Sequence, residues 1–542
     1  FFTLGECHSP KVKNNTEWHS PKMRSNSVRI RNICILSCLI SVGFVFNGCS
    51  QKGDRQANIK PQLQQVSAAE KVVKAELGES RDLSPIFMCY NVNSTQVADW
   101  QDRDFMAAVS QLSPSTLRIP GGDVGNYWDW QRGGLIEDIS SLPAGLPFFL
   151  RFKARQYTAS KLEDFKAGLA NSNTKPIFVL NMLTAGLESQ LEMLRQAKAL
   201  GMEIEYVELG NEFYFNIPNY KKTFPNPRAY GLVAKEWTAA VKQEFPNAKV
   251  SVVGVVPAPN KPPRLQHWNK VMRGTVLPTA DAITLHIYNG HGLKDLKTKP
   301  DSYPYFQKDE VPTILGEPFR NWQSLQNDGN YQAIPDDKQI WITEYNLFED
   351  IFQDGKDKPI PRVAGSWTHG LYNLATSLLF LEEARIETIC NHSLSEGSIF
   401  GAVLNTSDSF VNPANPNMTT TPMSLSATGE ALSLLGEATQ DMTTATQIEF
   451  ANVMQQKGKD NFKYPTVYGW QFSNNRDRQA VIVNLSAQAV ELDLSNLSGY
   501  ANYQQISGDA QDLVNNSTVL TTEKRAINNK IRLAPYSVSK LY

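Results

Sequence analysis

The sequence lacks two features that mark common binding classes. Basic residues are not in excess, since 53 Lys and Arg stand against 54 Asp and Glu and the net charge is −1. Nucleic acid is therefore not an expected partner, because binding to phosphates needs a local concentration of positive charge. The 6 cysteines form no CxxC pair and no Cys/His cluster, so the sequence indicates no structural zinc site. We expect no metal ion and no organic cofactor.

The N-terminal part also lacks an apolar run long enough to cross a bilayer. The apolar run Ile33–Phe46 has 14 residues, which at about 1.5 Å per residue falls short of the hydrocarbon core. Met23 and several arginines precede it, as at the start of a signal peptide. The next segment, Phe46-Asn47-Gly48-Cys49-Ser50, resembles a bacterial lipobox with Cys49 as the lipidated residue. We therefore expect an exported outer-membrane lipoprotein, in contact with the membrane through its anchor only. An ordinary cleaved signal, with a periplasmic or secreted product, is the alternative.

Length and pattern divide the chain into four parts. Residues 1–49 are assigned to an upstream extension and the signal peptide, and residues 50–82 to a polar linker rich in Gln, Lys and Glu. The remaining length exceeds one ordinary compact core, which favours two folded domains. We predict a catalytic domain over residues 83–440 and a second domain over residues 441–542.

Residues 83–440 show apolar runs of strand length in alternation with helical patterns. This alternation is typical of a parallel α/β sheet, and eight strand–helix units in this length predict a (β/α)8 TIM barrel. The expected strands are 85–91, 115–120, 176–181, 203–209, 249–255, 282–288, 339–344 and 386–392. After residue 440, short alternating runs with polar turns between them predict a C-terminal antiparallel β-sandwich. The predicted fold class is therefore α/β, a barrel followed by a sandwich.

Two of the expected strands deliver a glutamate. Glu212 follows the fourth strand, and Glu344 ends the seventh. Catalytic groups of TIM barrels lie at the C-terminal ends of the strands, and strands four and seven face one another across the mouth. A retaining glycosidase needs two carboxyl groups about 5–5.5 Å apart. A glutamate at a strand end can also be merely exposed, and Glu349 and Asp350 compete with Glu344 from nearby loop sequence.

Four motifs resemble those of a large clan of retaining TIM-barrel glycoside hydrolases with catalysts on strands four and seven. The resemblance is nearest to the α-L-arabinofuranosidase and heparanase/β-glucuronidase-like branches and covers about residues 83–440. The motifs are Gly210-Asn211-Glu212, Ile342-Thr343-Glu344-Tyr345-Asn346, His286-Ile287-Tyr288, and Leu117-Arg118-Ile119-Pro120-Gly121-Gly122 followed by Asn126-Tyr127-Trp128-Asp129-Trp130. Four motifs on the expected strands are specific for the clan but say little about the substrate.

The resemblance implies roles for five residues. Glu212 would be the acid/base, and Glu344 would be the nucleophile. Asn211 would hold the 2-hydroxyl of the sugar, a contact that can tighten in the transition state. Tyr288 would donate to Glu344, and Arg118 would pair with it and keep it ionised. Arg118 could instead be a structural ion-pair partner.

Four further residues are candidates for substrate binding, three of them with a structural alternative. His286 either contacts the sugar or is a satisfied barrel histidine. Trp128 and Trp130 either stack on the sugar or pack their loop. His392 ends the eighth strand and points to the same mouth.

Cys89 and Cys390 fall on the first and eighth strands, which are neighbours when the barrel closes. Export permits a disulfide. A bond between adjacent parallel strands is geometrically awkward, however. Two buried free thiols are therefore expected.

The sequence thus predicts a retaining glycoside hydrolase that cleaves O-glycosidic bonds of a polysaccharide or oligosaccharide by double displacement. A surface carbohydrate-binding protein without turnover and a transglycosylase with the same site are the alternatives. Arabinofuranosides, β-glucuronides and β-xylosides all stay open as substrates. The sequence predicts neither exo or endo action nor an oligomeric state.

Overall fold

The computed structural model describes most residues after position 71. The described ranges are 72–136, 160–256, 263–289, 306–347, 363–395, 401–404, 423–515 and 519–542. The expected signal peptide, the lipidation candidate Cys49, residues 50–71 of the expected linker, and Glu349 and Asp350 lie outside them. Within these ranges, no helix has both the length and the apolar character needed to cross a membrane.

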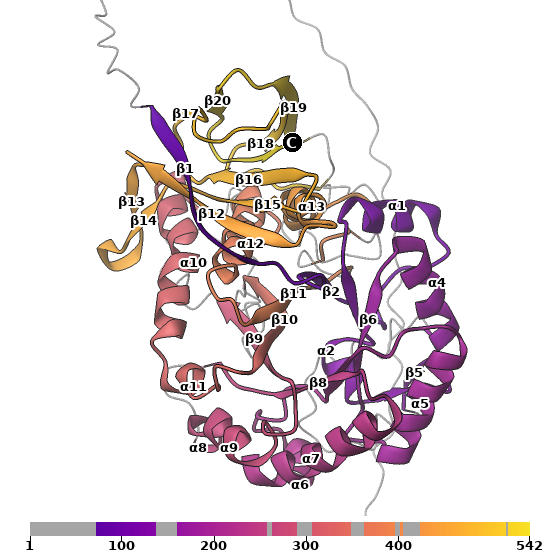
Figure 1. The fold of residues 1–542 in the computed structure, drawn as a ribbon. Helices are drawn as coiled ribbons and strands as arrows, with labels where there is room; N and C mark the ends of the chain where they lie inside the picture. Colours follow the sequence, from indigo (N-terminus) through magenta and orange to yellow (C-terminus); the bar gives the residue numbers. More distant parts are fainter. Residues whose placement is uncertain are drawn as a thin grey trace, which may run out of the picture. The chain divides into compact units, whose positions relative to one another are not determined.

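Eight parallel strands close into a barrel, seen at the centre of Figure 1. Their order around the barrel is β10-β11-β2-β3-β6-β7-β8-β9. The strands are β2 (Met88–Asn91), β3 (Thr116–Ile119), β6 (Lys175–Val179), β7 (Tyr206–Leu209), β8 (Lys249–Val253), β9 (Ala282–Asn289), β10 (Gln339–Leu347) and β11 (Ile386–His392). Each overlaps one of the eight expected strands, and the predicted TIM barrel is confirmed. Their apolar sequences follow from burial on both faces, by side chains inside the barrel and by helices outside it.

Helices surround the barrel and cover its outer face (Figure 1). They are α1 (Arg103–Gln111), α4 (Leu162–Ser172), α5 (Leu187–Ala199), α7 (Pro227–Glu244), α9 (Trp268–Thr275), α10 (Val311–Gln326), α12 (Trp367–Phe380) and α13 (Ala427–Thr439). Short elements in the connections are α2 (Gly122–Gly125), β4 (Trp128–Asp129), β5 (Gly134–Leu135), α6 (Pro218–Thr223), α8 (Pro263–Gln266), η3 (Lys308–Glu310) and α11 (Gly329–Gln332). Side-chain caps begin several helices; for example, Asp102 accepts from the first-turn backbone N–H groups of α1.

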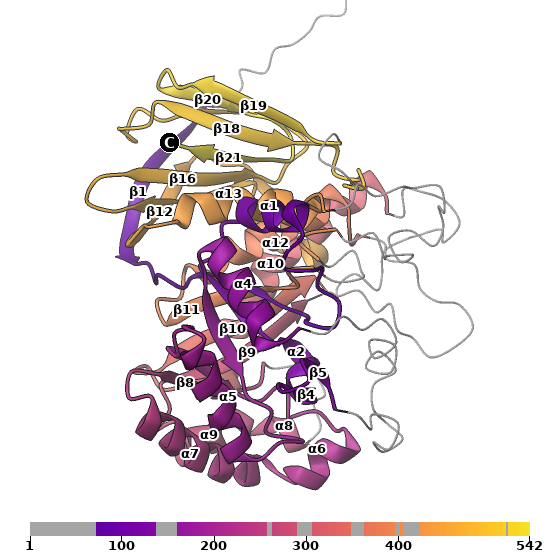
Figure 2. The same cartoon turned by 90° about the vertical axis from the view of Figure 1, so that its right-hand side faces the viewer.

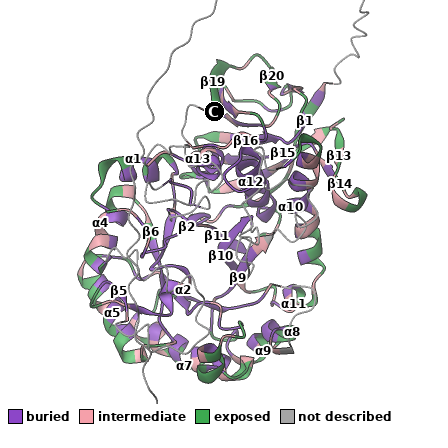
Figure 3. Ribbon diagram, turned by 180° about the vertical axis from the view of Figure 1, so that it is seen from behind, coloured by how far each residue is buried: buried purple, intermediate pink, exposed green. Residues whose placement is uncertain are grey.

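The helices bury one face or all faces according to their position. In α7 the outward positions are exposed and the inward ones buried, and Figure 3 shows this two-sided pattern around the barrel. Every residue of α12 is buried. This helix packs on one side against the barrel, where Tyr345 and Ser377 share a hydrogen bond of 2.7 Å. On another side the Trp367 indole N–H donates to the Tyr536 carbonyl, beside the last strand of the C-terminal domain.

The second domain is one continuous sheet of nine strands, with the order β19-β18-β21-β16-β15-β12-β1-β17-β20. Most of its strands contribute to a separate apolar cluster, to which Ile482, Ile531 and Leu541 belong, and the curled sheet has the sandwich-like form seen in Figure 2. The strands are β1 (Val73–Asp82), β12 (Thr444–Ala451), β15 (Val467–Ser473), β16 (Arg478–Asn484), β17 (Val490–Asp493), β18 (Asn502–Ser507), β19 (Thr521–Ala526), β20 (Lys530–Leu533) and β21 (Ser537–Leu541). A small β13–β14 hairpin (Gln455–Lys457, Lys463–Pro465), with η4 (Lys459–Asn461) in its turn, lies outside this sheet.

The assignment of residues 50–82 to a polar linker is wrong for its last part. Val73–Asp82 forms β1, which pairs antiparallel with β12 and parallel with β17. Val73 and Ala75 are buried in the sandwich core, while the residues between and after them are mostly exposed. A strand with so few buried residues resembles a polar linker in sequence. The second domain therefore consists of one strand from before the barrel sequence and eight strands from after it.

The prediction of free thiols at Cys89 and Cys390 is also wrong. The structure contains a disulfide between them. β2 and β11 are adjacent, and Cys89 lies directly opposite Cys390 in their register. Both side chains are fully buried in an apolar cluster with residues of β6, β7, β9 and β10, and therefore lie inside the barrel. The direct pairing of the two positions brings the sulfur atoms together.

Candidate active site

The two predicted catalytic glutamates meet at the C-terminal mouth of the barrel. Glu212 follows β7, and Glu344 lies near the end of β10. One carboxylate oxygen of each and one ring nitrogen of His286 all lie within 4.8 Å of one another. Glu344 is 6% exposed and Glu212 is 12% exposed at their side chains. Both are thus largely withdrawn from solvent within the described structure.

The turn after β7, which carries Glu212, has an unusual backbone conformation with positive φ angles. Gly210 has φ +81°, and a Cβ there would lie 2.0 Å from the Phe213 ring, so only glycine fits. Glu212 itself has φ +51°. A non-glycine residue in this left-handed region is uncommon and is held there by its surroundings. The Tyr214 hydroxyl, 2.8 Å from Glu212 Oε1, is one such contact.

Glu344 is surrounded by groups that favour its ionised form. Arg118 Nη1 lies 2.8 Å from Oε1, and the Tyr288 hydroxyl donates to Oε2 at 2.6 Å. His286 and His392 lie 3.6 and 3.8 Å from Oε2. Burial by itself would raise the pKa of Glu344. The imidazoles, the guanidinium and the phenolic hydrogen bond outweigh burial and hold this pKa well below its usual range.

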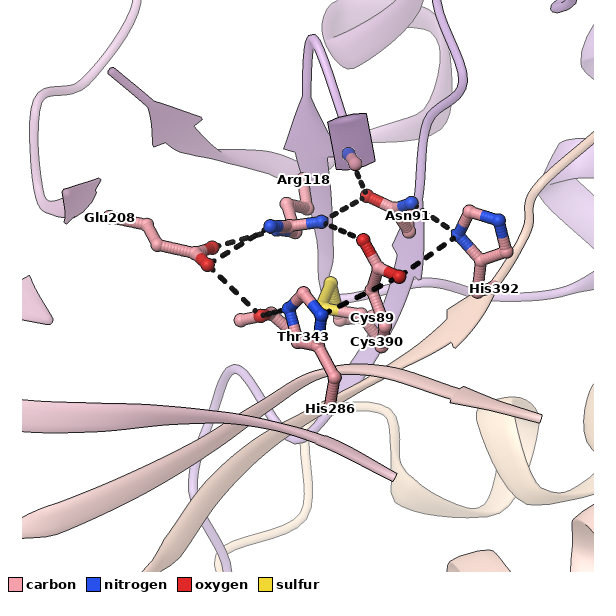
Figure 4. The surroundings of a disulfide bond; sticks show 10 residues. Cys89, Asn91, Arg118, Glu208, His286, Thr343, Cys390 and His392 are labelled. Carbon is pink, nitrogen blue, oxygen red and sulfur yellow. Dashed lines mark hydrogen bonds and ion pairs between the residues drawn. A yellow bond between two sulfur atoms is a disulfide. The ribbon is translucent and has the colours of Figure 1, made fainter. Parts of the chain in front are cut away.

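Arg118 is the centre of the hydrogen-bond network drawn in Figure 4. Its guanidinium is fully buried and binds Glu208 in bidentate fashion, with Nε–Oε2 2.7 Å and Nη2–Oε1 3.0 Å. Nη1 also donates to Asn91 Oδ1, and Nη2 to Asn211 Oδ1. Burial would lower the pKa of Arg118, but the carboxylates of Glu208 and Glu344 raise it above its ordinary value. The guanidinium therefore stays charged. Hydrogen bonds to two carboxylates and two side-chain amides fix its orientation.

His286 connects the two glutamates. Its Nδ1 lies 2.8 Å from Glu212 Oε1, and its Nε2 lies 3.1 Å from the Thr343 hydroxyl oxygen. Burial would lower the pKa of His286, whereas Glu344 and Glu212 raise it, and the net shift is upward. The imidazole is thus a proton carrier in direct contact with the predicted acid/base.

The structure also brings Asn211 and His392 into this network. The Asn211 side chain accepts from Arg118 and donates to Asp123 Oδ1 at 3.1 Å. His392 Nδ1 lies 2.5 Å from Asn91 Nδ2. Both residues therefore lie where the sequence predicts, at the mouth and beside the carboxylates.

The two tryptophans are not part of the network. Trp128 is only 3% exposed and packs against Phe165, with ring centroids 5.6 Å apart. That burial leaves no face for a sugar, and the packing interpretation holds for Trp128. Trp130 is partly exposed, and its indole N–H donates to Ser189 Oγ at 3.3 Å. This hydrogen bond directs the Trp130 ring to the start of α5 and not to a catalytic glutamate.

Several residues of the site were not identified from the sequence. Asn91, Glu208, Thr343 and Tyr214 each contact Arg118, His286 or a catalytic glutamate. Asn91 ends β2, so the rule that located Glu212 could have found it. Thr343 lies in the middle of β10, Glu208 lies before the end of β7, and Tyr214 lies in a turn. These three carry no such signal, because side chains at such positions are expected to pack rather than to bind.

The sequence matches no family model and no curated protein. Solved structures do match. The GH51 arabinofuranosidase from Xanthomonas axonopodis pv. citri aligns with 87% of this chain and 99% of its own, at 14% identity and TM-score 0.63. The family 51 α-L-arabinofuranosidase from Bifidobacterium longum aligns with 86% and 99%, at 14% identity and TM-score 0.62. A 4-O-α-L-rhamnosyl-β-D-glucuronidase from Fusarium oxysporum 12S aligns with 86% and 99%, at 12% identity and TM-score 0.53. At these identities the likeness shows the shared fold of a TIM barrel with a second domain, and confirms the clan resemblance at that level.

Proposed function

We propose that the protein is a retaining glycoside hydrolase with Glu344 as nucleophile and Glu212 as acid/base. The observation that carries this proposal is the approach of the two carboxylates and His286 to within 4.8 Å at the barrel mouth. Retaining enzymes hold their carboxyl groups about 5–5.5 Å apart, whereas inverting enzymes keep about 6.5–9.5 Å for an intervening water. The short approach supports double displacement.

The surroundings of each glutamate suit its proposed role. Glu344 is ionised by Arg118 and Tyr288 and attacks the anomeric carbon, while Glu212 gives its proton to the departing oxygen. The bond from the sugar to the leaving group breaks as the bond to Glu344 forms. Glu212, now a carboxylate, removes a proton from water, and that water releases the sugar from Glu344.

Asn211 is the proposed contact to the 2-hydroxyl of the bound sugar. Its amide oxygen accepts from Arg118, and one amide hydrogen is directed to Asp123. Because an amide carries two N–H donors, the second can donate to a substrate hydroxyl. A contact of this kind contributes most when it tightens in the transition state.

α-L-Arabinofuranosides are the first substrate class to test. Arabinofuranosidases are among the solved structures that this chain resembles in fold, and one of these structures is an arabinose complex. β-Glucuronides and β-xylosides are the alternatives. For location, the lipobox-like segment at Cys49 supports an exported lipoprotein. Such a protein would meet polysaccharide or oligosaccharide substrates outside the cytoplasm.

The test is hydrolysis of 4-nitrophenyl α-L-arabinofuranoside, β-D-glucuronide and β-D-xyloside by the full-length protein and by E344Q. Glu344→Gln keeps the size of the side chain but removes the nucleophile, so hydrolysis should fall to background. Glu236→Gln, on an exposed position of α7, is the matched control and should keep wild-type activity. Equal turnover by E344Q and E236Q would refute the proposal. Binding without turnover by the wild type would favour the carbohydrate-binding alternative, and dominant transfer to added acceptor sugars would favour a transglycosylase.

A further inference from the structure

Glu208 is a buried carboxylate that the proposed reaction does not use. It lies on β7 and is 0% exposed. Its partners are on β3 and β10, neither of which is next to β7 in the barrel. The Glu208 carboxylate therefore reaches across the barrel interior, as Figure 4 shows, and connects strands that make no direct backbone contact. A buried charge in such a place must be fully paired, because an unpaired one is costly.

The partners of Glu208 lead separately to the two catalytic glutamates. On one side it holds Arg118, which donates to Glu344. On the other side Oε1 accepts from the Thr343 hydroxyl at 3.2 Å. Thr343 in turn contacts His286, which contacts Glu212. Glu208, Thr343 and His286 thus form a continuous buried chain of hydrogen bonds that ends at Glu212.

The hydroxyl of Thr343 fixes the proton position on His286. It has a single hydrogen, which it donates to Glu208, so it can only accept at its 3.1 Å contact with Nε2. Nε2 therefore carries a hydrogen. Nδ1 then faces Glu212 Oε1 at 2.8 Å as an acceptor when the ring is neutral and as a donor when it is charged. In this arrangement a protonated Glu212 can hydrogen-bond to a neutral ring.

We propose that Glu208 and Thr343 are positioning residues, which fix the Nε2–H tautomer of His286 for Glu212 and orient Arg118 toward Glu344. This inference rests on the proposed glycosidase function for its kinetic consequences. The tautomer itself is a property of the folded protein and holds independently of any reaction. The single carboxylate of Glu208 thus positions the partners of both Glu212 and Glu344.

Without the Thr343 hydroxyl, the ring hydrogen of His286 should no longer be confined to Nε2. The groups that face His286 are Glu212 after β7, Glu344 on β10 and Arg118 on β3. In T343V the ring is free to carry its hydrogen on Nδ1, where it would donate to the Glu212 carboxylate and stabilise the ionised acid. The alkaline limb of the kcat/KM profile should therefore move to lower pH. We expect kcat to fall about tenfold to a hundredfold, because a smaller fraction of Glu212 then carries the proton that it gives to the leaving group, with little change in KM.

The experiment compares T343V, T343S, E208Q and T388V in the full-length protein, on an aryl glycoside that the wild type cleaves. T343S restores the hydroxyl and should recover the wild-type pH profile. Thr388 on β11 is the matched control, since it is fully buried and its hydroxyl has no hydrogen-bond partner among the residues that the structure describes. T388V should keep the wild-type profile. E208Q should lose kcat at least as strongly as T343V, because it also withdraws the counter-charge of Arg118.

A wild-type pH profile in T343V would overturn the inference while leaving the proposed function intact. Absence of glycosidase activity in the wild type would instead refute the proposed function. A second measurement covers that outcome and any variant that does not fold. Nitrogen-15 NMR of histidine-labelled wild-type protein, recorded at a pH at which the His286 ring is neutral, should show its single ring hydrogen on Nε2. A neutral ring with hydrogen on Nδ1 would overturn the inference, whatever the activity.

Discussion

Replacing Arg118 with methionine tests how much of the structure depends on the buried charges. Arg118 and Glu208 are both 0% exposed at their side chains, and Glu344 is 6% exposed. Methionine fills much of the same space but leaves both carboxylates without their cation. Removing one partner of a buried ion pair costs about 3–5 kcal/mol. We expect the free energy of unfolding at neutral pH to fall by about that amount in R118M.

The loss of unfolding free energy in R118M should depend on pH, and Glu344 sets the direction of this dependence. Its pKa is lowered in the folded protein, so its pairing stabilises the fold above the unfolded pKa of about 4.3 and this stability is lost as the pH falls further. The difference in unfolding free energy between wild type and R118M should therefore be largest above about pH 5 and shrink in more acidic solution.

Urea unfolding followed by tryptophan fluorescence measures this difference at each pH. Arg195→Met is the matched control, because Arg195 also makes several short ion pairs but is 38% exposed. Exposed pairs contribute little, since water screens them. R195M should therefore unfold close to wild type. Equal destabilisation of R118M and R195M would refute the reasoning that burial, rather than the number of ion pairs, decides the cost.

Two further predictions concern the nucleophile and the barrel closure. Tyr288→Phe removes the hydrogen bond that lowers the pKa of Glu344, so the acidic limb of kcat/KM should move to higher pH; an unmoved limb would show that the phenol does not stabilise the carboxylate. Replacing Cys89 and Cys390 by serine removes a bond between residues 301 positions apart. The free energy of unfolding should fall by about 2–5 kcal/mol, and an unchanged melting temperature of the double variant would contradict a structural role for the bond.

The barrel was predictable because its strands carry a strong local signal. The run 176–180, for example, is apolar throughout, as expected of a strand that is covered on both faces. β1 gave no such signal, since only Val73 and Ala75 need to be buried and its partner β12 lies more than 360 positions further along the sequence. A pairing at that distance follows from the tertiary fold and not from local pattern.

Part of the site was predictable from the position of a residue along its strand. Glu212 and Glu344 were found because the C-terminal ends of barrel strands meet at one mouth, and His286 was identified through its resemblance to a motif of the clan. Glu208 is next to last in β7 and fully buried, and an acid is expected there only if the interior supplies its partners. Those partners, Arg118 and Thr343, come from strands about 90 and 135 positions away in the sequence. The disulfide was missed for the same reason, because it depends on the register between the first and last strands of the barrel.

The most direct test of the central claim is to trap the sugar on the enzyme. In a 2-deoxy-2-fluoro glycosyl fluoride that matches the best substrate, the 2-fluorine slows both displacements and the reactive fluoride leaving group keeps the first one fast. A retaining enzyme therefore accumulates the covalent intermediate. After proteolysis, mass spectrometry should find one sugar on the peptide that contains Glu344, and none in E344Q. A label on Glu212, Glu349 or Asp350, or hydrolysis with inversion of the anomeric centre and no label, would contradict the assignment of Glu344 as the nucleophile.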